Sequence, residues 1–154
     1  MINLKKKIII IAIIGFVIDQ LTKFLVINYV DNVNIIPGFL KFIYAKNTGV
    51  AFSMLSNNVL LIILISLILL VFLLYELRND HNLNKISILS YGLLFGGIIG
   101  NLFDRIFRGH VIDFISFTFG KYSFAVFNIA DILITVGVLL LIIKIIKEKP
   151  ITGR

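Results

Sequence analysis

The fold is decided by the stretch Asp131-Ile-Leu-Ile-Thr-Val-Gly-Val-Leu-Leu-Leu-Ile-Ile143, in which one carboxylate stands directly before an uncharged apolar run. Such a run is typical of a membrane helix. An Asp at a bilayer centre costs roughly 2.5–3.5 kcal/mol even on a lenient insertion scale, so an Asp that borders hydrocarbon is a candidate functional residue. A second carboxylate, Asp113, lies upstream in a short polar and aromatic connector, Val111-Ile-Asp-Phe114. Two acids at one membrane face predict a pair that shares a proton.

The composition of the whole chain indicates an integral membrane protein. Of its 154 residues, 59% are hydrophobic and only 15% are charged, and the mean hydropathy is +1.05. A soluble domain of this length could not bury so much apolar surface. The length fits one compact domain over residues 1–154, which we expect to act as a monomer. Cysteine is absent, which excludes disulfides, thiolate metal sites and a cysteine nucleophile.

Four apolar runs are each close to the ~20 residues that a bilayer requires. We predict an all-α integral membrane protein with four transmembrane helices, at about Lys7–Tyr29, Val59–Leu77, Ile86–Phe107 and Ala125–Ile146. The first run resembles a secretory signal peptide, but no small-x-small cleavage site follows it, so we interpret it as an uncleaved span.

Basic residues set the expected orientation of the four spans. The termini and the connection between spans two and three carry Lys5, Lys6, Lys7, Arg78, Lys85, Lys144, Lys147, Lys149 and Arg154, whereas the other two connections carry Lys41, Lys46, Arg108 and Lys121. This bias predicts cytoplasmic N- and C-termini and places Asp113 at the extracytoplasmic face. Because the basic residues lie beside apolar runs, the net charge of +7 indicates contact with membrane lipids rather than with nucleic acid.

The two connections on the predicted extracytoplasmic side contain strand-like segments. Phe39-Leu-Lys-Phe-Ile-Tyr44 is aromatic and β-branched, and turn residues flank it at Pro37-Gly38 and Asn47-Thr-Gly49. Phe114-Ile-Ser-Phe-Thr-Phe119 has a similar composition. We therefore expect a small extracytoplasmic sheet, formed by about 34–58 and 109–124, that lies on the membrane.

Glycines and polar residues recur at helical spacing inside the spans. Gly92, Gly96 and Gly100 share one face of the third span, which predicts a close helix–helix contact. Asp19 and Lys23 are four residues apart and can neutralise each other, although Arg105 is a second possible partner for Asp19.

Further polar side chains are expected near the outer ends of spans three and four. Asn101 and Arg105 face one way, whereas Asp104 points elsewhere. Asn128 and Asp131 lie three residues apart, a spacing typical of an N-cap with an acidic first turn. Asn47 alone would be only a turn residue.

Other hydrolase chemistries lack the residues that they need. His110 and His81 are the only histidines and no His-Glu-x-x-His occurs, so a metalloprotease is excluded and no metal or other cofactor is expected. Ser116 and Ser123 have Lys121 nearby but no nucleophile elbow. Two coupled carboxyl groups could instead hydrolyse an amide, one activating a water and the other polarising the carbonyl. They could also carry protons through a transporter.

Five sequence blocks resemble the successive motifs of bacterial lipoprotein signal peptidase (signal peptidase II). They occur in the family's order across Asp19–Asp131 and are Asp19-Gln-Leu-Thr-Lys23, Asn47-Thr-Gly-Val-Ala-Phe52, Gly96-Gly-Ile-Ile-Gly-Asn-Leu-Phe-Asp-Arg105, Val111-Ile-Asp-Phe114 and Phe127-Asn-Ile-Ala-Asp131. The four-span outline extends the resemblance over the whole chain.

The resemblance implies an aspartyl endopeptidase of the plasma membrane. It would remove the signal peptide from diacylglyceryl-modified prolipoproteins by cutting before the lipidated Cys, and globomycin-type cyclic peptides would inhibit it. Asp113 and Asp131 would be the catalytic pair, and a loop around Val50–Asn58 would cover the site. The substrate-binding and supporting residues that the motifs imply are Asp19, Lys23, Asn47, Gly49, Asn101, Arg105, Asn128 and Ala130.

Two other classes of function compete with a peptidase. A small proton-coupled transporter would use the same carboxylates, but the sequence shows neither repeat symmetry nor a helix broken at the midplane. A helix-bundle assembly factor would use the polar residues for packing only. A presenilin-like protease is disfavoured because no Gly-x-Gly-Asp occurs.

Overall fold

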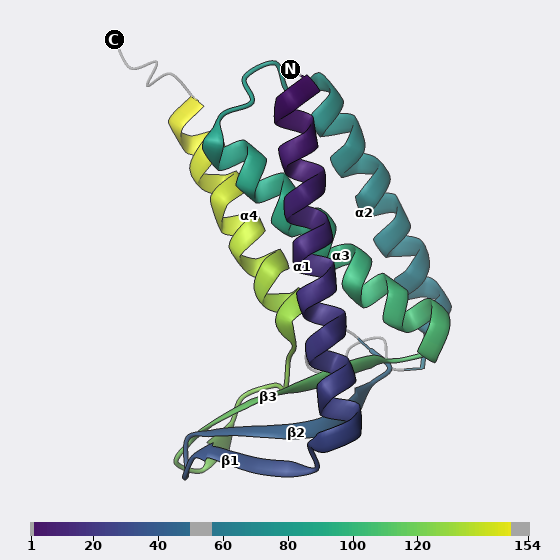
Figure 1. The fold of residues 1–154 in the computed structure, drawn as a ribbon, viewed down its shortest axis with the longest axis vertical. Helices are drawn as coiled ribbons and strands as arrows, with labels where there is room; N and C mark the ends of the chain where they lie inside the picture. Colours follow the sequence, from purple (N-terminus) through teal and green to yellow (C-terminus); the bar gives the residue numbers. More distant parts are fainter. Residues whose placement is uncertain (1, 50–56, 149–154) are drawn as a thin grey trace.

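The computed structural model describes residues 2–49 and 57–148, which form four helices and a small sheet (Figure 1). All four helices are long and apolar enough to cross a membrane. In chain order the elements are α1 (Ile2–Tyr29), β1 (Asn32–Ile36), β2 (Leu40–Asn47), α2 (Val59–Asn79), α3 (Lys85–Arg108), β3 (Val111–Phe119), β4 (Tyr122–Ser123) and α4 (Ile129–Glu148). The chain is therefore a mostly helical, multi-pass membrane protein.

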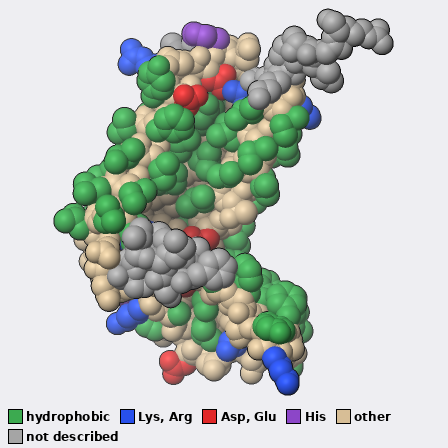
Figure 2. All heavy atoms as spheres, turned by 180° about the vertical axis from the view of Figure 1, so that it is seen from behind, with side chains coloured by type: hydrophobic (Ala, Val, Ile, Leu, Met, Phe, Trp, Pro, Cys, Tyr) green, Lys and Arg blue, Asp and Glu red, His purple; other side chains and the backbone are tan. Residues whose placement is uncertain are grey.

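Helix α3 forms the centre of the bundle. It is the least apolar of the four spans, with a mean hydropathy of 1.7, yet most of it is buried. Helices α1, α2 and α4 surround it and turn most of their side chains outward (Figure 1). On the face shown in Figure 2, apolar side chains cover the helical part, and basic side chains lie near the chain termini and around the sheet.

Glycines on α3 allow α1 to approach closely, as the spacing predicts. A Cβ on Gly96 would lie 2.9 Å from the carbonyl oxygen of Ala12, and a Cβ on Gly100 would lie 2.6 Å from Oδ2 of Asp19. Neither distance is possible for a real Cβ, so a larger residue would push the backbone of α1 away at Gly96 and would displace the side chain of Asp19 at Gly100. The close approach places the polar residues of α1 against those of α3.

The sheet lies at the end of the bundle opposite the chain termini, where α1 reaches down to it (Figure 1). Its strand order is β1-β2-β3-β4, and all neighbours are antiparallel. The last turns of α1 place Val26 in a buried cluster with Ile112, Phe114 and Ile115 of β3. This cluster anchors the sheet to the helices.

Asp113 lies within strand β3, opposite Ala45 of β2; the strand begins at Val111, three residues before the strand-like segment that starts at Phe114. The residues before α4 pair with the same strand, because the carbonyl of Phe127 accepts the N–H groups of Phe114 and Ile115. For that reason α4 begins at Ile129, later than the expected start at residue 125. This pairing brings the start of α4 next to Asp113.

The loop expected around Val50–Asn58 falls, over residues 50–56, outside the described residues.

Candidate active site

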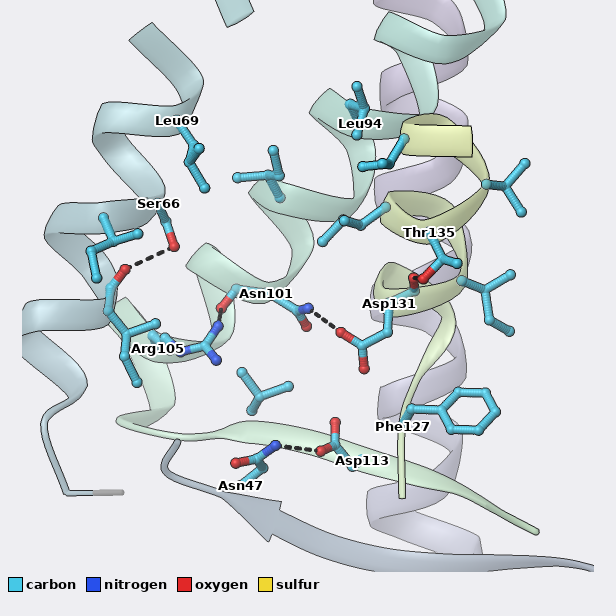
Figure 3. Close-up of a pocket in the computed structure, with 18 of the residues that line it drawn as sticks. Asn47, Ser66, Leu69, Leu94, Asn101, Arg105, Asp113, Phe127, Asp131 and Thr135 are labelled. Atoms are coloured by element: carbon cyan, nitrogen blue, oxygen red, sulfur yellow. Dashed lines mark hydrogen bonds between the residues drawn. The ribbon is translucent and has the colours of Figure 1, made fainter. Parts of the chain in front are cut away.

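A pocket of about 800 Å³ opens between the sheet and the inner faces of α2, α3 and α4. Its polar lining residues come from five elements and are Asn47, Ser66, Asn101, Arg105, Asp113, Asp131 and Thr135. Figure 3 shows Asp113 and Asp131 extending into the same space from β3 and from the start of α4. Seen from behind, acidic side chains reach the surface between the helical bundle and the sheet (Figure 2).

The first turn of α4 holds Asp131 in place. Asn128 is the N-cap, and its Oδ1 accepts the N–H of Asp131 at 3.0 Å, while Oδ2 of Asp131 accepts the N–H of Asn128 at 3.1 Å. This reciprocal pair is a capping box with Asp in the usual place of Glu. The next free N–H of the turn, that of Ala130, donates to Oδ1 of Asp19 at 2.9 Å. The expected cap therefore forms, and its two members are Asn128 and the pocket residue Asp131.

Amide groups of three asparagines surround the two carboxyl groups. Asp113 accepts from Nδ2 of Asn128 at 2.7 Å and from Nδ2 of Asn47 at 2.8 Å, and Asp131 accepts from Nδ2 of Asn101 at 2.8 Å. Among the described residues no hydrogen bond joins the two carboxyl groups directly. They are connected through Asn128, which contacts both.

The surroundings of Asp113 raise the pKa of its carboxyl group above that of an ordinary Asp. The side chain is only 2% exposed, and this burial, followed by the charge of Asp131, raises the pKa of Asp113 to about 6. Hydrogen bonds from Asn47 and Asn128 and the charge of Lys23 act in the opposite direction. Asp113 thus holds a proton over a pH range where an ordinary Asp is ionised.

A second group of acids lies behind the pocket and is neutralised by cations. Nζ of Lys23 lies 2.8 Å from Asp19 and 2.8 Å from Asp104, and all three side chains are 0% exposed. Arg108 pairs with the other oxygen of Asp104. The partner of Asp19 is therefore Lys23 and not Arg105.

Asn101 connects the neutralised group to the pocket. Its Oδ1 accepts from Lys23 at 3.2 Å and from Asn128 at 3.1 Å, so its Nδ2 is left to donate to Asp131. The ammonium group of Lys23 thereby fixes which way the amide of Asn101 is turned.

Comparisons with known proteins identify the family of this chain. Residues 11–147 match the family model described as signal peptidase (SPase) II. The chain belongs to the signal peptidase II family. Lipoprotein signal peptidases from Symbiobacterium thermophilum and Clostridium tetani are 39% and 38% identical to it; the alignments cover 90% and 95% of this chain and 93% and 96% of the relatives.

A solved structure supports the same assignment. It is a bacterial membrane enzyme that is 34% identical to this chain, with a TM-score of 0.84 and 94% of each chain covered. Membership of the signal peptidase II family implies that the protein is a peptidase.

In this member of the signal peptidase II family, Arg105 ties the turn after β2 to α3. Its Nη2 donates to the carbonyl of Gly49 at 2.8 Å and its Nη1 to the carbonyl of Asn101 at 3.2 Å. The N–H of Gly49 in turn donates to Oδ1 of Asn47 at 2.9 Å, which leaves the amide of Asn47 facing Asp113. Nε of Arg105 is buried and finds no acceptor among the residues that the structure describes.

The sequence did not predict the roles of two members of the polar network. Gln20 donates to both Asp19 and Asp104 at 3.1 Å and accepts from Arg108. Asp104 points away from the pocket, as expected, and forms a buried ion pair with Lys23. Both are polar residues inside predicted spans, a pattern that indicates a structural or functional role.

The described residues hold no group of three or more His, Cys, Asp or Glu side chains placed to bind a metal ion.

Proposed function

We propose that this protein is an intramembrane aspartyl endopeptidase that removes the signal peptide from diacylglyceryl-modified prolipoproteins, cutting before the lipidated Cys. The observation that carries the proposal is that Asp113 and Asp131 open onto one largely apolar pocket and have only amide partners. The names of the relatives, lipoprotein signal peptidases, supply the class of substrate.

In the proposed chemistry the two acids take different roles. Asp131 acts as the base and accepts a proton from a water, whose oxygen attacks the scissile carbonyl carbon. Asp113, whose pKa is raised to about 6, donates a hydrogen bond and then its proton toward the carbonyl oxygen. As the tetrahedral intermediate collapses, one hydroxyl proton returns to Asp113, the C–N bond breaks, and the proton held by Asp131 passes to the leaving amine. No covalent enzyme intermediate is required.

The shape of the pocket supports a substrate that arrives from the bilayer. Beyond the two acids the lining continues as apolar side chains of three helices, including Leu69 of α2, Leu94 and Ile98 of α3, and Ile134 and Val138 of α4. A signal helix can lie along these side chains with its scissile bond at the acids, while the acyl chains of the substrate remain in lipid. In this arrangement the termini are cytoplasmic and the acids are at the extracytoplasmic face.

The remaining motif residues position the reacting groups or the substrate. Asn47 and Asn128 orient Asp113, and Asn101 orients Asp131. Arg105 and Gly49 hold the turn after β2 at the rim of the pocket. Asp19, Lys23 and Ala130 act behind them by fixing the first turn of α4 and the amide of Asn101.

The test is cleavage by purified protein in lipid. A prolipoprotein carrying a diacylglyceryl-modified Cys should be shortened on a gel, and the same precursor without the lipid should be cut much more slowly. Mass spectrometry of the product should place the modified Cys at the new N-terminus. Addition of a globomycin-type cyclic peptide should block cleavage by occupying the pocket.

The matched variants are Asp113→Asn and Asp131→Asn, with Asp31→Asn as the control because Asp31 is an exposed acid near the sheet. Circular dichroism checks that each variant is folded. Cleavage that continues undiminished in a protein with both Asp113→Asn and Asp131→Asn would refute the mechanism, and equal cleavage of lipidated and unmodified precursor would refute the proposed substrate.

A further inference from the structure

A second groove lies in the half of the bundle that holds the chain termini, away from the two acids. It has a volume of about 410 Å³ and is almost wholly apolar. Residues of three helices line it. They are Lys5, Ile8, Ile9, Ala12, Ile13 and Phe16 of α1, Leu74 and Leu77 of α2, and Phe95 and Ile99 of α3.

The length of the groove matches one leaflet of a bilayer. Its α1 residues recur every three or four positions, so they form one stripe along the helix. From Lys5 to Phe16 this stripe is about 16 Å long at the usual rise of an α-helix. Half of a typical hydrocarbon core is about 15 Å. The groove therefore runs from one membrane surface to about the midplane.

A positive charge stands at the surface end of the groove. Lys5 lines the groove and is half-buried, and Lys6 and Lys7 beside it are exposed. Within the described part of the chain no ion pair joins Lys5 to a carboxylate. Glu76, on the same stretch of α2 as Leu74 and Leu77, is exposed and does not line the groove.

We propose that the groove is a binding site for one anionic phospholipid of the leaflet at the termini side. One acyl chain fills the apolar groove, and the ammonium group of Lys5 donates hydrogen bonds to the headgroup phosphate. The charge at the mouth, the apolar lining and the one-leaflet length each correspond to a part of such a lipid. The site shares no lining residue with the pocket of Asp113 and Asp131, so the inference is independent of the proposed peptidase chemistry.

Native mass spectrometry of the full chain in a neutral detergent can test this site. The protein is titrated with dioleoyl-phosphatidylglycerol or with dioleoyl-phosphatidylcholine, and adducts of one lipid per chain are counted. We expect the anionic lipid to bind about fivefold more tightly, the fold-change that corresponds to about 1 kcal/mol for one Lys near an anionic headgroup. Lys5→Gln should remove this preference, whereas Lys6→Gln, the same change at the exposed neighbour, should keep it.

A second pair of variants tests the acyl-chain part of the groove. Ile9 lines the groove and is 57% exposed, whereas Ile10 is 55% exposed and lies outside it. Ile9→Trp should fill the groove and abolish the one-lipid adduct of either lipid, and Ile10→Trp should bind as the wild type does. Equal retention of the two lipids by the wild type, equal effects within either matched pair, or a two-chain species in place of the lipid adduct would each overturn the proposal.

Discussion

Asp19 and Asp104 lie against Lys23 and Arg108, whereas Asp113 and Asp131, on the other side of Asn101, are held by asparagine amides. Both pairs come from segments close to the same end of the bundle; Asp19, Asp104 and Asp113 are buried, whereas Asp131 is partly exposed. The pair beside the cations is neutralised, and neither of its acids lines the pocket. Both acids beside the amides line the pocket, and burial raises the pKa of Asp113 to about 6.

On the proposed mechanism, one small bundle uses one pair of acids for packing and the other pair for catalysis. A buried carboxylate with a cation at 2.8 Å is compatible with a stable fold only while the cation is present, because removing the cation leaves an unpaired buried charge. A buried carboxylate with neutral donors is oriented without being fixed in one charge state. Activity and stability should therefore respond to different substitutions.

The largest expected effect is on the rate of cleavage. Asp113→Asn and Asp131→Asn should each lower kcat/KM by a factor of about 10²–10⁴ or more, because each removes a group that transfers a proton. The unfolding temperature should change little. Cleavage of a lipidated precursor and thermal unfolding, measured on the same samples, check the prediction. It would be contradicted by a variant that loses much of its folded protein while the molecules that remain folded cleave at the wild-type rate.

Next in size is the cost of breaking the neutralised group. Lys23→Met should destabilise the fold by about 3–5 kcal/mol, since it leaves Asp19 and Asp104 buried without their shared cation. Thermal unfolding in detergent measures the loss.

A matched variant separates charge from packing in that experiment. Adding Asp19→Asn and Asp104→Asn to Lys23→Met removes the unpaired charges, so part of the stability should return. If the triple variant is no more stable than Lys23→Met alone, the stability lost in Lys23→Met does not come from breaking the ion pairs.

A smaller effect is expected from pH. Because the raised pKa of Asp113 means that its proton is lost as pH rises through about 6, kcat/KM should fall about tenfold per pH unit above that value. Bound substrate displaces water and favours the protonated acid further, so the alkaline limb of kcat should lie at higher pH. Initial rates across a pH series give the alkaline limbs of kcat/KM and of kcat. A kcat/KM that stays level or increases between pH 6 and 8 would show that Asp113 does not act as the acid.

The smallest effect is a shift of that limb. Asn47→Ala removes a hydrogen bond that lowers the pKa of Asp113, so the alkaline limb should move upward, by about one pH unit if the bond is worth about 1.4 kcal/mol. Asn34→Ala, on the exposed strand β1, serves as the control. A downward shift, or an equal shift in the control, would contradict the role assigned to Asn47.

Much of this arrangement could be predicted from the sequence because it depends on local patterns. Apolar length predicted the four helices, and the spacing of Gly96 and Gly100 predicted a close helix contact. The three-residue spacing of Asn128 and Asp131 predicted the cap. Each feature needs only the geometry of one element.

What could not be predicted depends on how elements far apart in the chain pack together. Nothing in the sequence indicated that Lys23 would contact Asp104 as well as Asp19, because that contact depends on how α1 crosses α3. The bridging position of Asn128 likewise depends on the pairing of Phe127 with β3. Helical spacing describes one face of one helix and does not fix contacts between elements.

The capping box at Asn128 and Asp131 also bears on when the proposed Asp pair can form. Asp131 is held by the first turn of α4, which follows the other three helices in the chain, and Asp113 is oriented from that same turn and from β2. A nascent chain in which α4 has not yet been made carries only one of the two acids. On the proposed mechanism, the newly made protein would therefore stay inert until α4 has been made and has packed against β3.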